Sequence, residues 1–325
     1  MKMRQSIKRA LMISVLLLWA LCFVRPVCAA AGPDAGRTSS LTLFFGSGSA
    51  AFSGVEFRLY RVADMTGAGA FSLAGDFWNY SVSLTDLDSS GWRALAGTLE
   101  TYAARDQIAP DKRSSTDNGG TVVFDGLGAG LYLIAGDSCS AGGYTYTPEA
   151  FLISLPGLIG ETGEWVYSET AECKYTREPV SSEHDTVSRK VLKVWKDDGQ
   201  EGRRPKEIAV QLLKDGKLED TVTLNQDNNW RHTWTGLDGD ARWQVAEYRV
   251  PDGYTVSAER EGITFVVTNT YKDKGGSGGG GSGDSAGVLP QTGALWWPVP
   301  LLAFGGLLLF LTGWARWRKS EDTDE

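Results

Sequence analysis

The sequence predicts an all-β protein with two β-sandwiches in tandem, the first of which carries an inserted helix. Between the two ends of the chain, β-branched and aromatic residues form short runs that are broken by Gly, Asn and Asp turns. Such short, regularly interrupted runs are typical of sandwiches. A polar run at 181–185 separates the two domains, which are predicted at 32–180 and 187–273.

The first domain contains one segment whose apolar residues recur at helical rather than strand spacing. This segment, 89–105, carries an apolar stripe that includes Leu99, and we expect the stripe to pack on a sheet. Asp88 or Ser89 is the expected N-cap of the helix. The strands of this domain are expected at 41–45, 55–62, 121–124, 131–135, 151–155 and 165–175.

In the second domain, two polar side chains occupy positions that strand alternation directs toward the core. Ile263, Phe265 and Val267 share one face of a strand, and the same alternation puts Asn269 on that face. Glu247 follows the apolar residues of another strand in the same way. An amide buried without a partner costs about 2–7 kcal/mol and a charge costs more, so both side chains require partners. The strands are expected at 189–195, 208–214, 218–224, 230–235, 243–249, 254–258 and 263–271.

Lys193 is the candidate partner of these two side chains. It lies between Val191 and Trp195, which would place it in the core. Leu192 and Val194 make the opposite face of the strand apolar as well, so alternation alone leaves the side of Lys193 open.

Several segments of this domain carry a recognisable pattern: Val191-Leu-Lys-Val-Trp-Lys-Asp-Asp198, Arg204-Pro205, Val210-Gln-Leu-Leu213, Asn229-Trp230, Trp243-Gln-Val-Ala-Glu247-Tyr-Arg-Val-Pro251-Asp-Gly-Tyr254 and Thr268-Asn-Thr-Tyr271. On these segments the domain resembles, over essentially its whole length, the Cna B-type domain of Gram-positive surface proteins. The resemblance implies an inverse immunoglobulin-like sandwich with an intramolecular isopeptide bond between Lys and Asn. It makes Lys193 the nucleophile, Asn269 the acceptor and Glu247 the catalytic acid.

The physical chemistry of a buried site supports these roles. An apolar core lowers the pKa of a lysine, which gives the neutral amine that attacks. The same core raises the pKa of a glutamate, so a neutral Glu247 can donate a hydrogen bond to the Asn269 carbonyl. Ammonia leaves, and the reaction is a single turnover of maturation rather than catalysis on a substrate. The alternative is a buried Lys–Glu pair whose network Asn269 completes without a covalent bond.

The first domain carries a looser set of motifs: Gly54-Val-Glu-Phe-Arg-Leu-Tyr-Arg-Val-Ala-Asp64, Gly120-Thr-Val-Val-Phe-Asp-Gly-Leu127, Gly130-Leu-Tyr-Leu133 and Phe151-Leu-Ile-Ser-Leu-Pro156. On these motifs it resembles the N-terminal domain of sortase-assembled pilins. Its first strand has no lysine, and Gly136 stands where the glutamate would be, so no isopeptide bond is expected here.

Lys174 is a candidate for the lysine that joins pilin subunits. The stretch from Trp165 to Lys174 has the spacing of the pilin motif that carries this lysine, although Glu172-Cys173 replaces the Tyr-Pro of that motif. The alternative is a surface lysine at the end of a strand.

Residues 1–31 indicate export of the chain. They have a basic start, an apolar run and small residues before the expected cleavage site, which is typical of a signal peptide. Export permits a disulfide between Cys139 and Cys173, the two cysteines outside this segment. Two buried free thiols are the alternative.

The segment Leu289-Pro290-Gln291-Thr292-Gly293 resembles the LPxTG sorting signal of cell-wall-anchored proteins. A flexible Gly/Ser linker at 274–288 precedes it. An apolar transmembrane segment at 294–315 and a cytoplasmic tail at 316–325, which opens with basic residues, follow it. The resemblance implies that a sortase cleaves after Thr292 and transfers the chain to a peptidoglycan cross-bridge or to another pilin subunit.

The composition excludes several other classes of function. The formal net charge of −8 disfavours nucleic acid and anionic lipid surfaces as partners, so membrane contact is expected only before sorting. Phosphate-binding Gly loops, zinc-ligand spacings and serine nucleophile elbows are absent from the sequence. No cofactor, no metal and no enzymatic activity are therefore expected.

Taken together, these features predict a structural protein on the cell wall of a Gram-positive bacterium. The first interpretation is a minor or basal pilin subunit with a stalk domain stiffened by the isopeptide bond. The alternative is a monomeric wall-anchored adhesin whose first domain binds a host or microbial ligand, which the sequence does not identify.

Overall fold

The computed structural model describes residues 32–272, apart from residues 35, 49, 67–68, 160–162 and 181–184. The predicted signal peptide, linker, sorting motif and C-terminal membrane segment lie outside the described residues. Within the described part of the chain, no helix combines the length and the apolar character that crossing a membrane requires.

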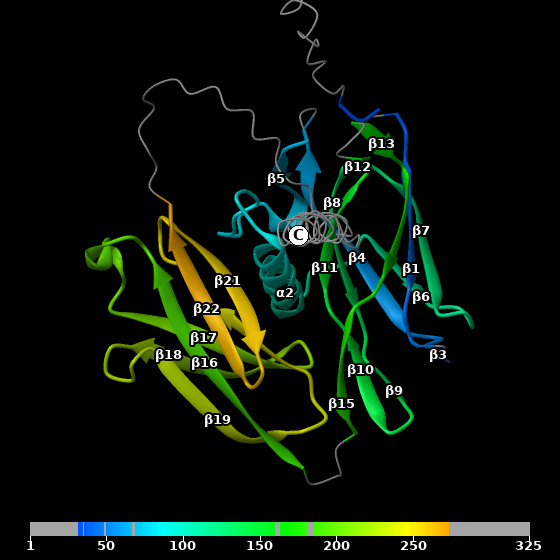
Figure 1. The fold of residues 1–325 in the computed structure, drawn as a ribbon. Coiled ribbons are helices and arrows are strands. Elements are labelled where there is room, and N and C mark those ends of the chain that lie inside the picture. The colour runs from blue at the N-terminus through cyan, green and yellow to red at the C-terminus, as the bar shows by residue number, and fades with distance from the viewer. Residues whose placement is uncertain are drawn as a thin grey trace, which may run out of the picture.

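The first sandwich is built from short strands and one long helix (Figure 1). Its elements are β1 (Ser39–Phe44), β2 (Gly46–Ser47), β3 (Ala50–Ala51), β4 (Glu56–Met65), β5 (Phe71–Leu73), η1 (Gly75–Phe77), α2 (Ser89–Arg105), β6 (Lys112–Ser115), β7 (Thr121–Leu127), β8 (Gly130–Gly136), β9 (Cys139–Ala141), β10 (Tyr144–Pro148), β11 (Phe151–Leu155), β12 (Gly157–Ile159), β13 (Glu164–Val166), β14 (Ser168–Glu172) and β15 (Tyr175–Pro179).

Two sheets of the first sandwich enclose its core. One sheet has the order β14-β1-β7, and the other has the order β11-β8-β4-β5, with β6 paired to β4. A single cluster of buried residues spans both sheets and includes Leu43 of β1, Phe57 of β4 and Ile134 of β8. β1 runs parallel to β14, with Leu43 opposite Ala171, so the first strand and a late strand of this domain are neighbours.

The single strand predicted at 165–175 is wrong, because the chain changes partners twice in this segment. β13 pairs with β12, β14 pairs with β1, and β15 pairs with β10 in a small separate sheet of order β15-β10-β9. One straight strand cannot supply hydrogen bonds to three neighbours in different sheets. The break between β14 and β15 falls at Cys173 and Lys174, where Cys173 is buried in the core and Lys174 is exposed.

The second sandwich has the strands that alternation predicted, with ends shifted by a few residues. A sheet of order β19-β16-β22-β21 packs on a sheet of order β18-β17-β20, and β16 runs parallel to β22. Ile263 is an exception to the prediction, because it precedes the last strand and is exposed. The elements are β16 (Thr186–Lys196), η2 (Glu201–Arg203), β17 (Glu207–Lys214), β18 (Lys217–Asn225), β19 (Arg231–Asp238), β20 (Trp243–Glu247), β21 (Tyr254–Glu261) and β22 (Thr264–Tyr271).

Helix α2 has the predicted limits and begins at a side-chain cap. The Asp88 carboxylate accepts a hydrogen bond of 2.7 Å from the backbone N–H of Gly91, which satisfies one of the free donors of the first turn. Leu95 and Leu99 pack with Leu133 in a cluster on the outer face of the β11-β8-β4 sheet. The prediction that one face of the helix packs on a sheet is therefore confirmed.

The opposite face of α2 contacts the second sandwich, which the sequence did not predict. Figure 1 shows α2 between the two sandwiches. Thr98 Oγ1 accepts a 2.8 Å hydrogen bond from the backbone N–H of Ala258 in β21, and Glu100 forms a 2.7 Å ion pair with Arg242 beside β20. β20 and β21 are end strands of their sheets. End strands have unpaired backbone groups, which make an open edge prone to pairing with other chains. Helix α2 covers both of these edges.

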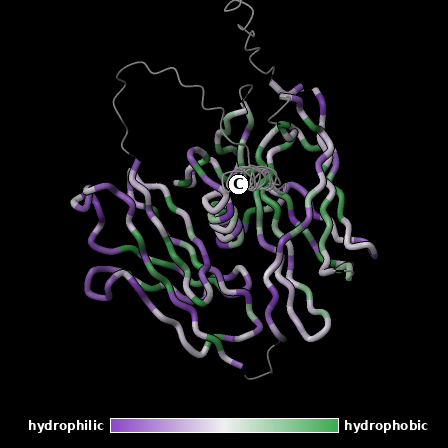
Figure 2. Tube along the Cα trace, viewed as in Figure 1, coloured by the Kyte–Doolittle hydropathy of each residue, from purple (hydrophilic) through white to green (hydrophobic). Residues whose placement is uncertain are grey.

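The hydropathy of the chain follows this arrangement. Figure 2 shows hydrophobic stretches along the inner strands of each sandwich and hydrophilic stretches in the outer turns. Each sandwich has its own cluster of buried residues, and a further cluster lies under α2. Tyr102 of α2 belongs to the cluster of the second sandwich, so the cores of the two domains are in contact through the helix. The predicted fold class, two immunoglobulin-like sandwiches with one inserted helix, is confirmed for the described residues.

We expect that Asp88→Ala lowers the free energy of unfolding by about 1 kcal/mol, because the first turn of α2 loses its cap. The measurement is urea unfolding of residues 32–292, carried out with Asn269→Ala also present so that no covalent tie forms. Asp125→Ala, which removes an exposed carboxylate on β7, is the matched control and should leave the midpoint unchanged. Equal midpoints for both variants would contradict a stabilising role of the cap.

Candidate functional site

The structure brings Lys193, Glu247 and Asn269 together from three strands. In the parallel pair of β16 and β22, Lys193 is opposite Val267 and Trp195 is opposite Asn269, so Lys193 and Asn269 are diagonal neighbours on one face. Glu247 ends β20 in the facing sheet. Its Oε2 lies 3.7 Å from Lys193 Nζ, and its Oε1 accepts a 3.0 Å hydrogen bond from Asn269 Nδ2.

All three side chains are sealed from solvent. The side chains of Lys193 and Glu247 are both 0% exposed, and Asn269 is 0% exposed as a whole residue. Lys193 shares its face with buried Val191, which settles the side that alternation left open. The predicted core positions of Glu247 and Asn269 are likewise those that the strands adopt.

Burial shifts both titratable groups toward their neutral forms. Desolvation lowers the pKa of Lys193 to about 7, although the nearby Glu247 carboxylate opposes this shift. Desolvation also raises the pKa of Glu247, against the opposing effects of Lys193 and Asn269. An ion pair and a neutral pair bind the same number of protons, so pH does not select between them. Burial removes the hydration that stabilises the two charges, so the neutral pair is favoured over the ion pair.

The polar atoms of the site are incompletely paired. Lys193 Nζ donates to the backbone carbonyls of Val194 at 3.1 Å and Val267 at 3.3 Å. Among the described residues, Glu247 Oε2 and Asn269 Oδ1 have no hydrogen-bond partner. A proton on Glu247 would make its carboxyl a donor, and rotation of the Asn269 amide would present Oδ1 as the acceptor. The site can therefore hold the arrangement that attack on the amide carbon requires.

A second polar network closes one side of this site. Asp197 accepts hydrogen bonds from Arg204 at 2.6 and 2.7 Å and from the Tyr254 hydroxyl at 3.2 Å. Tyr254 in turn packs edge-on against Trp195, and Lys193 Nζ lies 4.2 Å from the centre of the Trp195 ring. The Asp197 network therefore holds the aromatic ring that covers Lys193. All of these residues lie in the segments on which the family resemblance depends, but alternation gives them no role.

The first sandwich fills the corresponding place with apolar side chains. Leu41 and Leu43 are the inward residues of β1, and Ala171 is the inward residue of the parallel strand β14. At Gly136, an added Cβ would lie 2.6 Å from the ring of Phe57. A glutamate at this position would therefore collide with the core, which gives a structural reason why no cross-link is expected in this domain.

The other residues singled out in the sequence lie apart from this site. Lys174 is exposed in the link between β14 and β15, where its carbonyl accepts a 2.8 Å hydrogen bond from Glu149 N–H. Cys139 and Cys173 are free thiols that belong to the core of the first sandwich, and burial raises the pKa of Cys173 to about 12. No group of His, Cys, Asp or Glu side chains in the described ranges is arranged to hold a metal ion.

Comparison with known proteins identifies the second sandwich. Residues 189–270 match the family Cna protein B-type domain. The chain is 43% identical over 96 residues to the collagen adhesin of Staphylococcus aureus, a match that covers 27% of this chain and 8% of the adhesin. Most of the second sandwich is therefore similar to the Cna protein B-type domain, and the chain spans only a small part of the length of that relative.

Three solved structures are also similar to this chain. A single B repeat unit of the collagen binding surface protein of S. aureus has a TM-score of 0.26 and 21% identity, covering 72% of this chain and 98% of that one. The major pilin SpaD of Corynebacterium diphtheriae has a TM-score of 0.27 and 13% identity, covering 74% and 99%. The basal pilin SpaE of Lactobacillus rhamnosus GG has a TM-score of 0.30 and 12% identity, covering 69% and 84%.

Proposed function

We propose that this protein is a structural surface protein of a Gram-positive cell wall, a minor or basal pilin subunit whose second domain is stiffened by an isopeptide bond between Lys193 and Asn269. The observation that carries the proposal is the convergence of Lys193, Glu247 and Asn269 in a site without solvent exposure. The Cna B-type match of residues 189–270 supports the same assignment. A sortase would join the chain to the wall through Thr292.

The proposed reaction forms an amide and releases ammonia. The lone pair of neutral Lys193 Nζ attacks Cγ of Asn269, and the carboxyl of Glu247 donates a hydrogen bond to Oδ1 as negative charge develops there. Glu247 then takes a proton from the attacking amine and delivers it to Nδ2. The bond from Cγ to Nδ2 breaks and ammonia leaves, so no oxidant or cofactor is consumed. The fixed proximity of the groups replaces an external catalyst.

The cross-link would have a mechanical consequence. It joins β16 and β22, which are the first and last strands of the second sandwich and run parallel to each other. A force applied at the two ends of this domain pulls these strands in opposite directions along their length. A covalent bond between them carries that force directly, so the strands between residues 197 and 263 are removed from the load path.

The intact mass of recombinant residues 32–292 tests the cross-link. We expect a deficit of one ammonia in the parent chain and the full mass in Glu247→Ala, because the alanine removes the acid that polarises Asn269. Lys193→Met and Asn269→Ala should also have the mass that their own sequences give. The full mass in the parent would reduce the site to a buried Lys–Glu pair, leaving only an ordinary sandwich.

We expect the rate of cross-linking to rise as the pH increases through about 7 and to fall again once the pH is high enough to deprotonate Glu247. The lowered pKa of Lys193, about 7, means that the amine gains its proton and loses reactivity as the pH falls below that value. The raised pKa of Glu247 is the limit on the alkaline side, where loss of its proton removes the donor.

This profile can be measured by diluting unreacted, denatured chain into buffers of different pH and quenching samples in acid for intact mass. A rate that is as high at pH 5 as at pH 9 would contradict the proposed role of Lys193 as a neutral amine with a lowered pKa. Unfolding of the Asn269→Ala variant at each pH is the control, because it reports any loss of folding that pH alone causes.

Lys174 is the proposed acceptor lysine for assembly, because it is exposed in a short link between two strands. In the native host, Lys174→Arg should abolish high-molecular-weight ladders of this protein on denaturing gels, since arginine keeps the charge but not the nucleophile. Lys112→Arg, at the other exposed lysine of the first domain, is the matched control. Undiminished ladders with Lys174→Arg would overturn this role, and a single wall-released band in the parent would favour a monomeric adhesin.

A further inference from the structure

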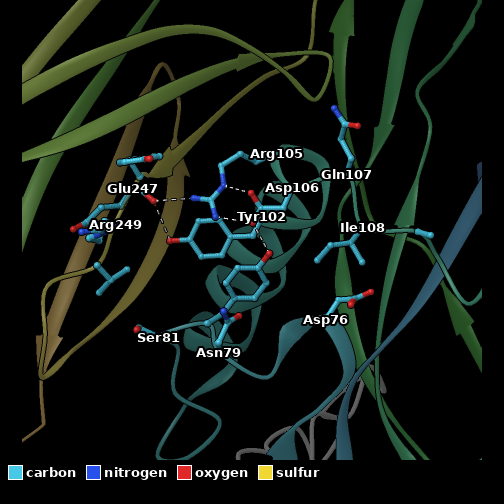
Figure 3. A pocket seen from close by; sticks show the side chains of 14 residues that line it. Asp76, Asn79, Ser81, Tyr102, Arg105, Asp106, Gln107, Ile108, Glu247 and Arg249 are labelled. Carbon is cyan, nitrogen blue, oxygen red and sulfur yellow. Dashed lines mark hydrogen bonds and ion pairs between the residues drawn. The ribbon is translucent and has the colours of Figure 1, made fainter.

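Two side chains of α2, in the first sandwich, form hydrogen bonds to the backbone carbonyl of Glu247, in the second. The Glu247 side chain points into the core, whereas its carbonyl oxygen points to α2. That oxygen accepts hydrogen bonds from Arg105 Nη1 at 3.1 Å and from the Tyr102 hydroxyl at 3.4 Å (Figure 3). Two donors from one domain thus converge on the residue that supplies the acid of a site in the other.

The two donors are themselves held in place. Arg105 forms a forked pair with Asp106, with both distances 2.7 Å, and its guanidinium carbon lies 4.3 Å from the centre of the Tyr102 ring. Tyr102 stacks on Tyr80 with ring centres 4.9 Å apart, and the Tyr80 hydroxyl donates to Asp106. A pocket of about 650 Å³ opens beside this cluster. The pair with Asp106 therefore fixes the guanidinium in the orientation in which Arg105 reaches the Glu247 carbonyl.

The position of Glu247 in its strand explains why these two hydrogen bonds affect the alignment of its carboxyl. Glu247 is the last residue of β20, and one further backbone hydrogen bond to β17, from Tyr248 N–H to the Ala209 carbonyl at 2.9 Å, follows its pairing with Val210. β20 is an end strand, so β17 is its only strand neighbour within this sheet. Strand ends open more readily than strand centres. The carboxyl must nevertheless stay within hydrogen-bond reach of Asn269 for the proposed reaction.

We propose that Tyr102 and Arg105 are positioning residues for the cross-link, which hold the end of β20 so that the Glu247 carboxyl stays aligned with Lys193 and Asn269. The proposal rests on the isopeptide function proposed above and adds a dependence of that reaction on the first domain. Neither residue touches the reacting atoms, so both act through the backbone of Glu247. Docking of α2 then completes the site.

Another contact in the same interface supplies a control. Arg242 forms an ion pair with Glu100 of α2 at 2.7 Å, but this pair does not contact Glu247, Lys193 or Asn269. Arg242→Met therefore weakens the docking of the helix without releasing the end of β20. Arg105→Met also removes an arginine from the interface, but in addition it removes the hydrogen bond to the Glu247 carbonyl.

The experiment compares the cross-linking rates of residues 32–292, which hold both domains, after dilution from denaturant at pH 7, with intact mass as the readout. We expect Arg105→Met to react about tenfold more slowly than the parent, because small displacements of a reacting group cost large factors in rate. Tyr102→Phe should slow the reaction less, since its hydrogen bond is longer, and Arg242→Met should react at the parent rate. Arg105→Lys should recover part of the rate, because it restores a donor.

Urea unfolding of the same variants with Asn269→Ala present separates positioning from stability. If Arg105→Met and Arg242→Met lose similar stability but only Arg105→Met loses rate, the positioning role is supported. A parent rate in Arg105→Met, or equal slowing in both variants, would overturn this role while leaving the cross-link intact. A parent chain that never loses ammonia would overturn the cross-link and the positioning role together.

Discussion

The parallel pairing of β16 with β22 is the constraint on which the site depends. It places the first and last strands of the second sandwich side by side, with Lys193 and Asn269 diagonal on the inward face. The first sandwich has the same pairing between β1 and β14, but there Leu43 and Ala171 fill the inward positions. One strand arrangement therefore accommodates two kinds of core. In the first domain apolar packing holds the paired strands, whereas in the second a polar trio occupies the place where a covalent bond can form.

How far the sequence predicts this site depends on how clearly each strand alternates. Asn269 and Glu247 lie on strands whose apolar residues fall mainly on one face, so both core positions were predicted correctly. Lys193 was ambiguous, because Leu192 and Val194 are half-buried on the other face of β16. The contact of α2 with the second domain was missed for a different reason. Thr98 is a polar residue outside the apolar stripe of the helix, and the backbone N–H that donates to it belongs to a strand far away in the sequence.

The interface between the domains covers strand edges of the second sandwich that would otherwise be open. β20 and β21 end their sheets, and open edges invite pairing with other chains. Helix α2 covers both edges with polar contacts, and Tyr102 adds an apolar contact to the core of the second domain. The two sandwiches are therefore in contact through both polar and apolar side chains of one helix.

Burying the polar groups of the unreacted site costs free energy, and the proposed reaction would remove part of that cost. Before reaction, the core contains a lysine and a glutamate without solvent exposure, with Glu247 Oε2 3.7 Å from Lys193 Nζ. Asn269 Oδ1 has no hydrogen-bond partner among the described residues, which costs about 1–3 kcal/mol. The reaction converts the Lys193 amine into an amide that carries no charge at any pH, and it removes one amide nitrogen as ammonia. Glu247 is then the sole titratable group of the trio, and desolvation raises its pKa. The free energy cost of burying the three groups would thus favour the product of the proposed reaction.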